Sequence, residues 1–94
     1  MTVATVIAPD GAVDTISLPI DTDESVKRLQ EIIGGYIEGV PLPEGRYMIF
    51  NENGKDKPHC INEMATSIAR EAESIQADDY IAGVAVVLPA EVLI

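Results

Sequence analysis

The polar residues with the clearest chemical potential gather around one turn and the start of one predicted helix. Asn51 and Glu52 come where a strand is expected to end, Lys55 follows in the same turn, and Asn62 opens the helix. The free N–H groups at a helix N-terminus can receive an anion, and a nearby lysine would add positive charge. These four residues predict a small polar pocket for a phosphate or nucleotide-like ligand. Ordinary turn and helix-cap chemistry explains the same residues and is the simpler interpretation.

Residues suited to catalysis or metal binding are few. The sequence contains one histidine and one cysteine, His59 and Cys60. Because adjacent side chains point apart on an extended chain, these two are poorly placed to act as base and nucleophile, and a zinc ion would need carboxylates as further ligands. The later acidic residues lack the spacing of a calcium-binding loop and are typical of a solvated face: Glu71, Glu73, Asp78 and Asp79. We therefore expect no catalytic residues, no metal site and no cofactor, and we predict that the protein is not an enzyme.

The chain is strongly acidic, with 16 Asp and Glu against 6 Lys and Arg and a formal net charge of −10. Such a charge repels nucleic acid phosphates and anionic lipids, so direct binding of DNA, RNA or a membrane is disfavoured, and a basic protein partner is favoured. The candidate interface residues are an acidic segment and two tyrosines, a residue type enriched in binding hot spots: Asp21, Asp23, Glu24, Tyr36 and Tyr47. In the alternative interpretation the acids maintain solubility and the tyrosines are partly buried core residues.

Size and composition indicate one domain, residues 1–94, because 94 residues with 47% hydrophobic content can bury a modest core. No apolar run approaches the roughly 18 residues of a membrane span. The N-terminal segment lacks a basic region, and Asp10 interrupts it where a signal peptide would stay apolar. A single cysteine allows no internal disulfide. The expectation is a cytoplasmic protein.

The first part of the chain predicts a β-hairpin followed by a helix. Residues 2–8 and 12–18 have the β-branched or alternating pattern of strands, and the Pro-Asp-Gly between them is turn chemistry. Three residues are capable N-caps, Asp21, Thr22 and Asp23, and we expect Thr22 or Asp23 to cap the helix. The double glycine at 34–35 ends it. Its apolar face repeats at helical spacing: Val26, Leu29, Ile32 and Ile33.

The second part predicts two strands joined by a turn. Residues 36–42 indicate a short or edge strand, because Pro41 and Pro43 interrupt it. Residues 47–51 contain the strongest aromatic and β-branched run and predict a central strand. A tight turn centred on Asn53 and Gly54 should follow.

The last part predicts a helix and a buried strand. Asn62 should cap the second helix. The near-continuous apolar run at 80–88 is typical of a buried strand, in which Gly83 marks a bulge or a close backbone approach. Strand order stays open, and this last strand fits a central or an edge position.

The expected fold is therefore α+β, with the order β-β-α-β-β-α-β and a mixed or antiparallel sheet of about five strands with two helices. The hairpin, capped helix and double-glycine stop are similar to the opening of the β-grasp fold of ubiquitin. This likeness concerns the pattern alone, since the chain has no C-terminal diglycine.

One set of residues runs in order from the first predicted helix to the last predicted strand: Leu29, Gln30, Gly34, Gly35, Tyr36, Ile37, Glu38, Asn51, Glu52, Gly54, Lys55, Asn62, Ala65, Thr66, Asp79 and Gly83. In these residues and their order the chain resembles a family of small proteins known only as a domain of unknown function, with members in bacteria, bacteriophages and mobile elements. The family has no established activity. Its setting implies a host-directed accessory role.

The leading functional hypothesis is a non-catalytic, acidic interaction protein of phage or mobile-element type that binds a host protein and could inhibit it. One alternative is a small-molecule or nucleotide-signal binding module that uses the polar pocket described above. Another is a structural homodimer that pairs through the exposed part of residues 80–88 or through the C-terminal tail.

Overall fold

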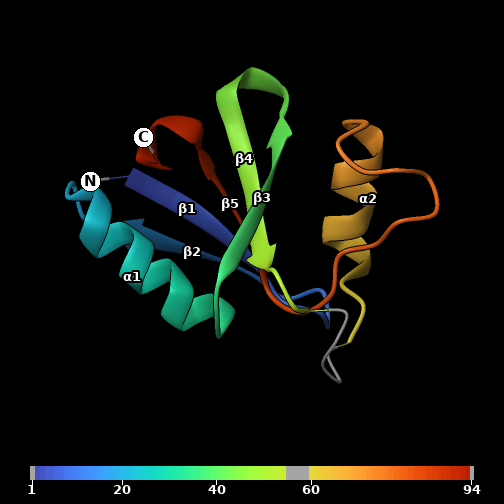
Figure 1. Ribbon diagram of the computed structural model, residues 1–94, viewed down its shortest axis with the longest axis horizontal. Coiled ribbons are helices and arrows are strands. Elements are labelled where there is room, and N and C mark those ends of the chain that lie inside the picture. Colours follow the sequence, from blue (N-terminus) through green and yellow to red (C-terminus); the bar gives the residue numbers. More distant parts are fainter. Residues whose placement is uncertain (1, 55–59, 94) are drawn as a thin grey trace.

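The computed structural model describes residues 2–54 and 60–93 (Figure 1). Within these residues the chain forms a five-stranded sheet and two α-helices. The elements are β1 (Thr2–Ile7), β2 (Val13–Leu18), α1 (Thr22–Ile33), β3 (Ile37–Leu42), β4 (Arg46–Asn51), α2 (Glu63–Glu71) and β5 (Ala85–Pro89), with 3-10 turns η1 (Pro43–Gly45) and η2 (Ala90–Leu93). The predicted α+β class and element order are confirmed. In the described part of the chain, no helix is both long enough and apolar enough to cross a membrane.

The strands lie in the order β2-β1-β5-β4-β3, and every neighbouring pair is antiparallel. The sheet is therefore antiparallel rather than mixed. The last strand, β5, lies at the centre between β1 and β4, which agrees with its apolar sequence because a central strand is covered on both faces. The edges are β2 and β3. The expected edge position of the proline-containing strand is confirmed for β3.

The two helices cover opposite faces of the sheet, as Figure 1 shows. Side chains alternate between the faces along a strand. In β4, Ile49 packs in the hydrophobic core with Leu29 of α1, whereas the adjacent Met48 packs in a separate core with Ala65 and Ala69 of α2. The small alanine side chains let α2 lie close to the sheet.

The N-terminal cap of α1 is Asp21, so the expectation of Thr22 or Asp23 was wrong. The backbone of Asp21 is extended (φ −68°, ψ 124°), and its side chain accepts a hydrogen bond from the Glu24 N–H at 3.0 Å. The buried hydroxyl of Ser25 donates to the backbone carbonyl of the proline that precedes the helix, at 2.8 Å. The cap therefore lies one or two residues earlier than expected.

The C-terminal end of α1 agrees with the prediction. Gly34 takes the left-handed conformation (φ 87°), and its N–H donates to the carbonyl of Gln30 at 2.8 Å. This is the position where glycine is favoured, because a Cβ would be strained there. The predicted β-hairpin and the helix that follows it are both present.

The final strand is shorter than predicted. Regular pairing begins at Ala85, and the preceding residues form only an isolated bridge between Ile61 and Ala82. Gly83 has a positive φ of 82°, and its N–H donates to the carbonyl of Cys60 at 2.9 Å. Gly83 therefore changes the backbone direction just before the strand. The irregularity that was expected inside the strand instead marks its N-terminal limit.

Candidate functional site

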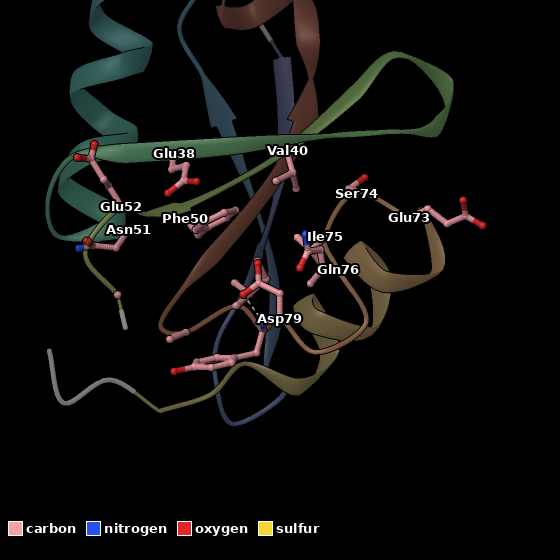
Figure 2. A pocket seen from close by; sticks show the side chains of 14 residues that line it. Glu38, Val40, Phe50, Asn51, Glu52, Glu73, Ser74, Ile75, Gln76 and Asp79 are labelled. Atoms are coloured by element: carbon pink, nitrogen blue, oxygen red, sulfur yellow. Dashed lines mark hydrogen bonds between the residues drawn. The ribbon is translucent and has the colours of Figure 1, made fainter. Parts of the chain in front are cut away.

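A cleft of about 750 Å³ lies between the β3–β4 hairpin and the segment that joins α2 to β5 (Figure 2). Its apolar lining comes from both sides: Val40, Phe50, Ile75, Ile81 and Ala82. Its polar lining consists of Asn51, Ser74, Gln76 and Tyr80 and four acidic residues, Glu38, Glu52, Glu73 and Asp79. The cleft thus has a mixed lining, in which apolar side chains and carboxylates lie side by side.

The hairpin side of the cleft follows from strand alternation. Glu38 lies opposite Phe50, and Val40 lies opposite Met48, in the antiparallel register of β3 and β4. Residues paired in this way point to the same face, which here is the face covered by α2. Figure 2 shows Glu38 and Val40 on the same side of β3, above Phe50.

The opposite side is an irregular segment held by specific hydrogen bonds. The hydroxyl of Ser74 donates to the carbonyl of Pro41 in β3. The Arg70 guanidinium of α2 donates from Nε and Nη2 to the carbonyl of Asp79, at 3.1 and 2.7 Å. Glu73 takes a positive φ of 56° as the chain leaves the helix. Because both ends of this segment are tied to regular structure, the cleft has a defined shape.

The turn after β4 forms one end of the cleft. The side-chain oxygen of Asn51 accepts a hydrogen bond from the Asn53 N–H at 2.8 Å, and the Gly54 N–H donates to the Asn51 carbonyl at 3.0 Å. The turn is therefore centred on Glu52 and Asn53, one residue earlier than predicted. Its side-chain bond holds Asn51, whereas Glu52 is exposed and lines the cleft.

Asn62 has a structural role. It is fully buried, and its Nδ2 donates to the carbonyls of Ile7 and Gly83, each at 2.9 Å. Its Oδ1 accepts from the N–H of Ala65 at 3.0 Å, as expected of a helix cap. The predicted grouping is therefore divided. Asn51 and Glu52 line the cleft, Asn62 does not, and Lys55 lies outside the described residues.

The five predicted interface residues lie in three parts of the fold. Asp21, Asp23 and Glu24 lie at the N-terminal end of α1. Tyr36, 71% exposed, follows the other end of that helix, about 18 Å away for a helix of this length. Tyr47 is half-buried on β4, where it pairs with Pro41. The role of each residue stays a prediction.

The charge of the cleft has one sign. Each charged residue in its lining is acidic, and no lysine or arginine is among the described residues that form it. Glu38 and Glu73 were not recognised from the sequence as parts of one site, since they are far apart in the chain. The available signal was the strand period, which places Glu38 on the same face as Val40. Among the described residues, no group of three or more His, Cys, Asp and Glu could hold a metal ion.

The comparison with family models matches residues 1–91 to a domain of unknown function, DUF3846. The chain belongs to this family. The predicted resemblance to a domain of unknown function is thereby confirmed, whereas the bacterial or phage origin stays a prediction. Comparisons with curated proteins and with solved structures gave no significant match. A function must therefore be argued from the cleft itself.

Proposed function

We propose that the protein is a non-catalytic binding protein whose cleft holds lysine or arginine side chains of a basic protein partner. One observation carries the proposal: four acidic residues and apolar side chains such as those of Val40 and Phe50 line the same cleft, and no described basic residue lines it. Lysine and arginine each have an apolar stem and a charged tip. The stem fits against Val40 and Phe50, and the tip fits between carboxylates such as those of Glu38 and Glu52.

The overall charge supports the same partner class. A formal net charge of −10 attracts a basic surface over several ångströms and raises the rate of encounter. Two identical chains repel each other by the same field, which weighs against the homodimer. The host-directed role of phage or mobile-element type and the cytoplasmic location remain expectations that this proposal does not require.

The size of the cleft supports the alternative that the protein binds a small molecule. Its volume of about 750 Å³ lies within the range of roughly 300–1,000 Å³ found for ligand pockets. The acidic lining disfavours a phosphate or nucleotide and favours a small organic cation. Native mass spectrometry of the protein purified from its own cells would reveal such a ligand as a retained adduct.

A charge-matched pair of variants tests the proposal. The cleft variant is Glu38→Gln, Glu52→Gln and Glu73→Gln. The control is Asp23→Asn, Glu24→Gln and Glu31→Gln, which removes the same number of charges from exposed positions of α1. Binding of a fluorescein-labelled, eight-residue peptide of alternating lysine and valine is followed by anisotropy at several salt concentrations.

We expect the cleft variant to bind about tenfold or more weakly, with a smaller salt dependence, because charges that the bound peptide covers contribute more than charges that stay in water. The control variant should stay within about threefold of the unmodified protein. Equal weakening by both variants would show that only the overall charge matters. A larger loss of affinity in the α1 variant would show that the peptide binds at the acidic segment of Asp23 and Glu24 instead of at the cleft.

A further inference from the structure

We propose that the partner binds as an added β-strand along the free edge of β3, with alternate side chains in two cavities. This inference rests on the proposed function, because the acidic cleft is one of these cavities. β3 is the last strand of the sheet and pairs with β4 on one side. Among the described residues, no strand pairs with its other side.

The hydrogen-bond pattern shows which backbone groups face outward. The Glu52 N–H donates to the carbonyl of Tyr36 at 3.0 Å, so these two residues form a hydrogen-bonded pair of the antiparallel ladder. Such pairs alternate with non-bonded pairs. The backbone groups of Ile37, Gly39 and Pro41 therefore point away from β4. Pro41 fits this alternation. It has no N–H that would need a partner in β4, and its carbonyl accepts a hydrogen bond from the Ser74 hydroxyl on the side away from β4.

The outward groups define a short recognition edge. The N–H and carbonyl groups of Ile37 and Gly39 are directed toward the space beside the sheet, and the contact between Pro41 and Ser74 closes the far end. Gly39 is exposed and has no side chain to obstruct an approaching backbone. Addition of a strand to such an edge is an established mode of peptide recognition, in which the backbone supplies affinity and side-chain pockets supply specificity.

Two cavities of different character flank this edge. The acidic cleft lies on the α2 face, beside Glu38 and Val40. A second hollow of about 450 Å³ lies on the α1 face and is mostly apolar, lined by Val26, Ile37, Gly39, Tyr47, Ile49 and Ala90 together with Glu38. Successive side chains of a strand point to opposite faces. The fitting segment therefore alternates basic residues, directed to the cleft, with apolar residues, directed to the second hollow.

The geometry also assigns the bonding residues of the partner. In an antiparallel pair, residues that exchange hydrogen bonds have side chains on the same face. Ile37 and Gly39 belong to the α1 face, so the apolar residues of the partner would bond to them through their backbone. The basic residues would have N–H groups that point away. A second copy of this chain is a poor occupant because both copies are strongly acidic.

Backbone methylation of the lysine–valine peptide tests this assignment without altering the protein. N-methylation of the central valine amides should weaken binding about tenfold or more, because it removes the donors that face β3. N-methylation of the lysine amides should change binding by less than about threefold. A stronger effect of lysine methylation would overturn the antiparallel arrangement, and equal binding by all three peptides would overturn strand addition.

A second pair of variants tests the protein side. Gly39→Pro removes the outward N–H at a position equivalent to that of Pro41, whereas Gly39→Ala keeps it and meets only ordinary contacts, the nearest being Ile49 Cγ2 at 3.4 Å. We expect about tenfold weaker binding for the proline variant alone, with unchanged circular dichroism. Methylation-insensitive binding that still depends on Glu38 would refute strand addition and leave the proposed function intact. Failure of the unmethylated peptide to bind would refute both, and a doubled mass in solution would assign the edge to a second copy.

Discussion

The side chain of Asn62 is bonded to the carbonyl of Ile7, which is 55 positions away in the sequence, at 2.9 Å. The same Nδ2 also donates to the carbonyl of Gly83, and the side-chain oxygen Oδ1 caps α2. One buried residue thereby joins the start of α2 to the end of β1 and to the approach of β5. Its role is to hold three parts of the fold together.

Asn62→Ala should destabilise the protein by about 3 kcal/mol, because it removes a helix cap and leaves two carbonyls without this donor. Asn53→Ala is the matched control, since that side chain is only half-buried and lies in a surface turn. It should change stability by less than about 0.5 kcal/mol. Urea unfolding followed by circular dichroism measures both. Equal midpoints would contradict the structural role of Asn62.

The corrected cap of α1 gives a second prediction. Asp21→Ala should cost about 1 kcal/mol, because the first turn loses the side-chain acceptor for the Glu24 N–H. Asp23→Ala, inside the first turn, should lose only the weaker interaction with the helix dipole, about 0.3–0.5 kcal/mol. Thermal unfolding at low ionic strength compares the two variants. A greater loss of stability for Asp23→Ala would indicate that Asp23, as first expected, is the N-terminal cap.

Two glycines near the cleft should differ in their tolerance of alanine. A Cβ at Gly54 would lie 2.9 Å from the Ala82 carbonyl oxygen and 3.2 Å from that of Asn51. A Cβ at Gly35 would lie 3.0 Å from the side-chain nitrogen of Asn51, and a side-chain amide can shift by a few tenths of an ångström more readily than backbone can. Gly54→Ala should therefore cost about 1–3 kcal/mol, and Gly35→Ala clearly less. Similar unfolding midpoints for the two variants would argue against the close backbone approach at Gly54.

The contact between Ser74 and Pro41 should govern local rather than global stability. Ser74→Ala should speed amide hydrogen exchange in residues 73–80 and change the free energy of unfolding by no more than about 1 kcal/mol. Ser67→Ala is the control, because Ser67 is exposed on α2. Exchange measured by mass spectrometry after pepsin digestion distinguishes them. Unchanged exchange in the Ser74 variant would mean that other contacts hold this side of the cleft.

The turn at Asn51 and the final strand show why element boundaries were harder to predict than the elements themselves. The Asn-Gly pair at 53–54 indicated the centre of the turn, but the side chain of Asn51 bonds to Asn53 and moves the centre one residue earlier. The run at 80–88 is uniformly apolar, so its pattern could not show where pairing begins. That point depends on the positive φ of Gly83 and its bond to Cys60.

The candidate site was predicted only in part for a related reason. Asn51 and Glu52 are neighbours in sequence, and the structure places both at the cleft. Glu38 and Glu73 reach the same cleft from separate elements. Nothing local distinguishes them from other surface acids, so their grouping required the hairpin and the Ser74 contact.

The sequence by itself determined the α+β class, the order of elements, the glycine end of α1 and the Asn62 cap. These features depend on interactions between residues a few positions apart, which strand and helix periods and cap preferences record directly. Only the tertiary structure decided the central place of β5, the edge position of β3 and the gathering of four acidic residues at the cleft. These depend on which distant segments pair, and pairing is selected by the packing of the whole sheet against two helices, which no local pattern contains.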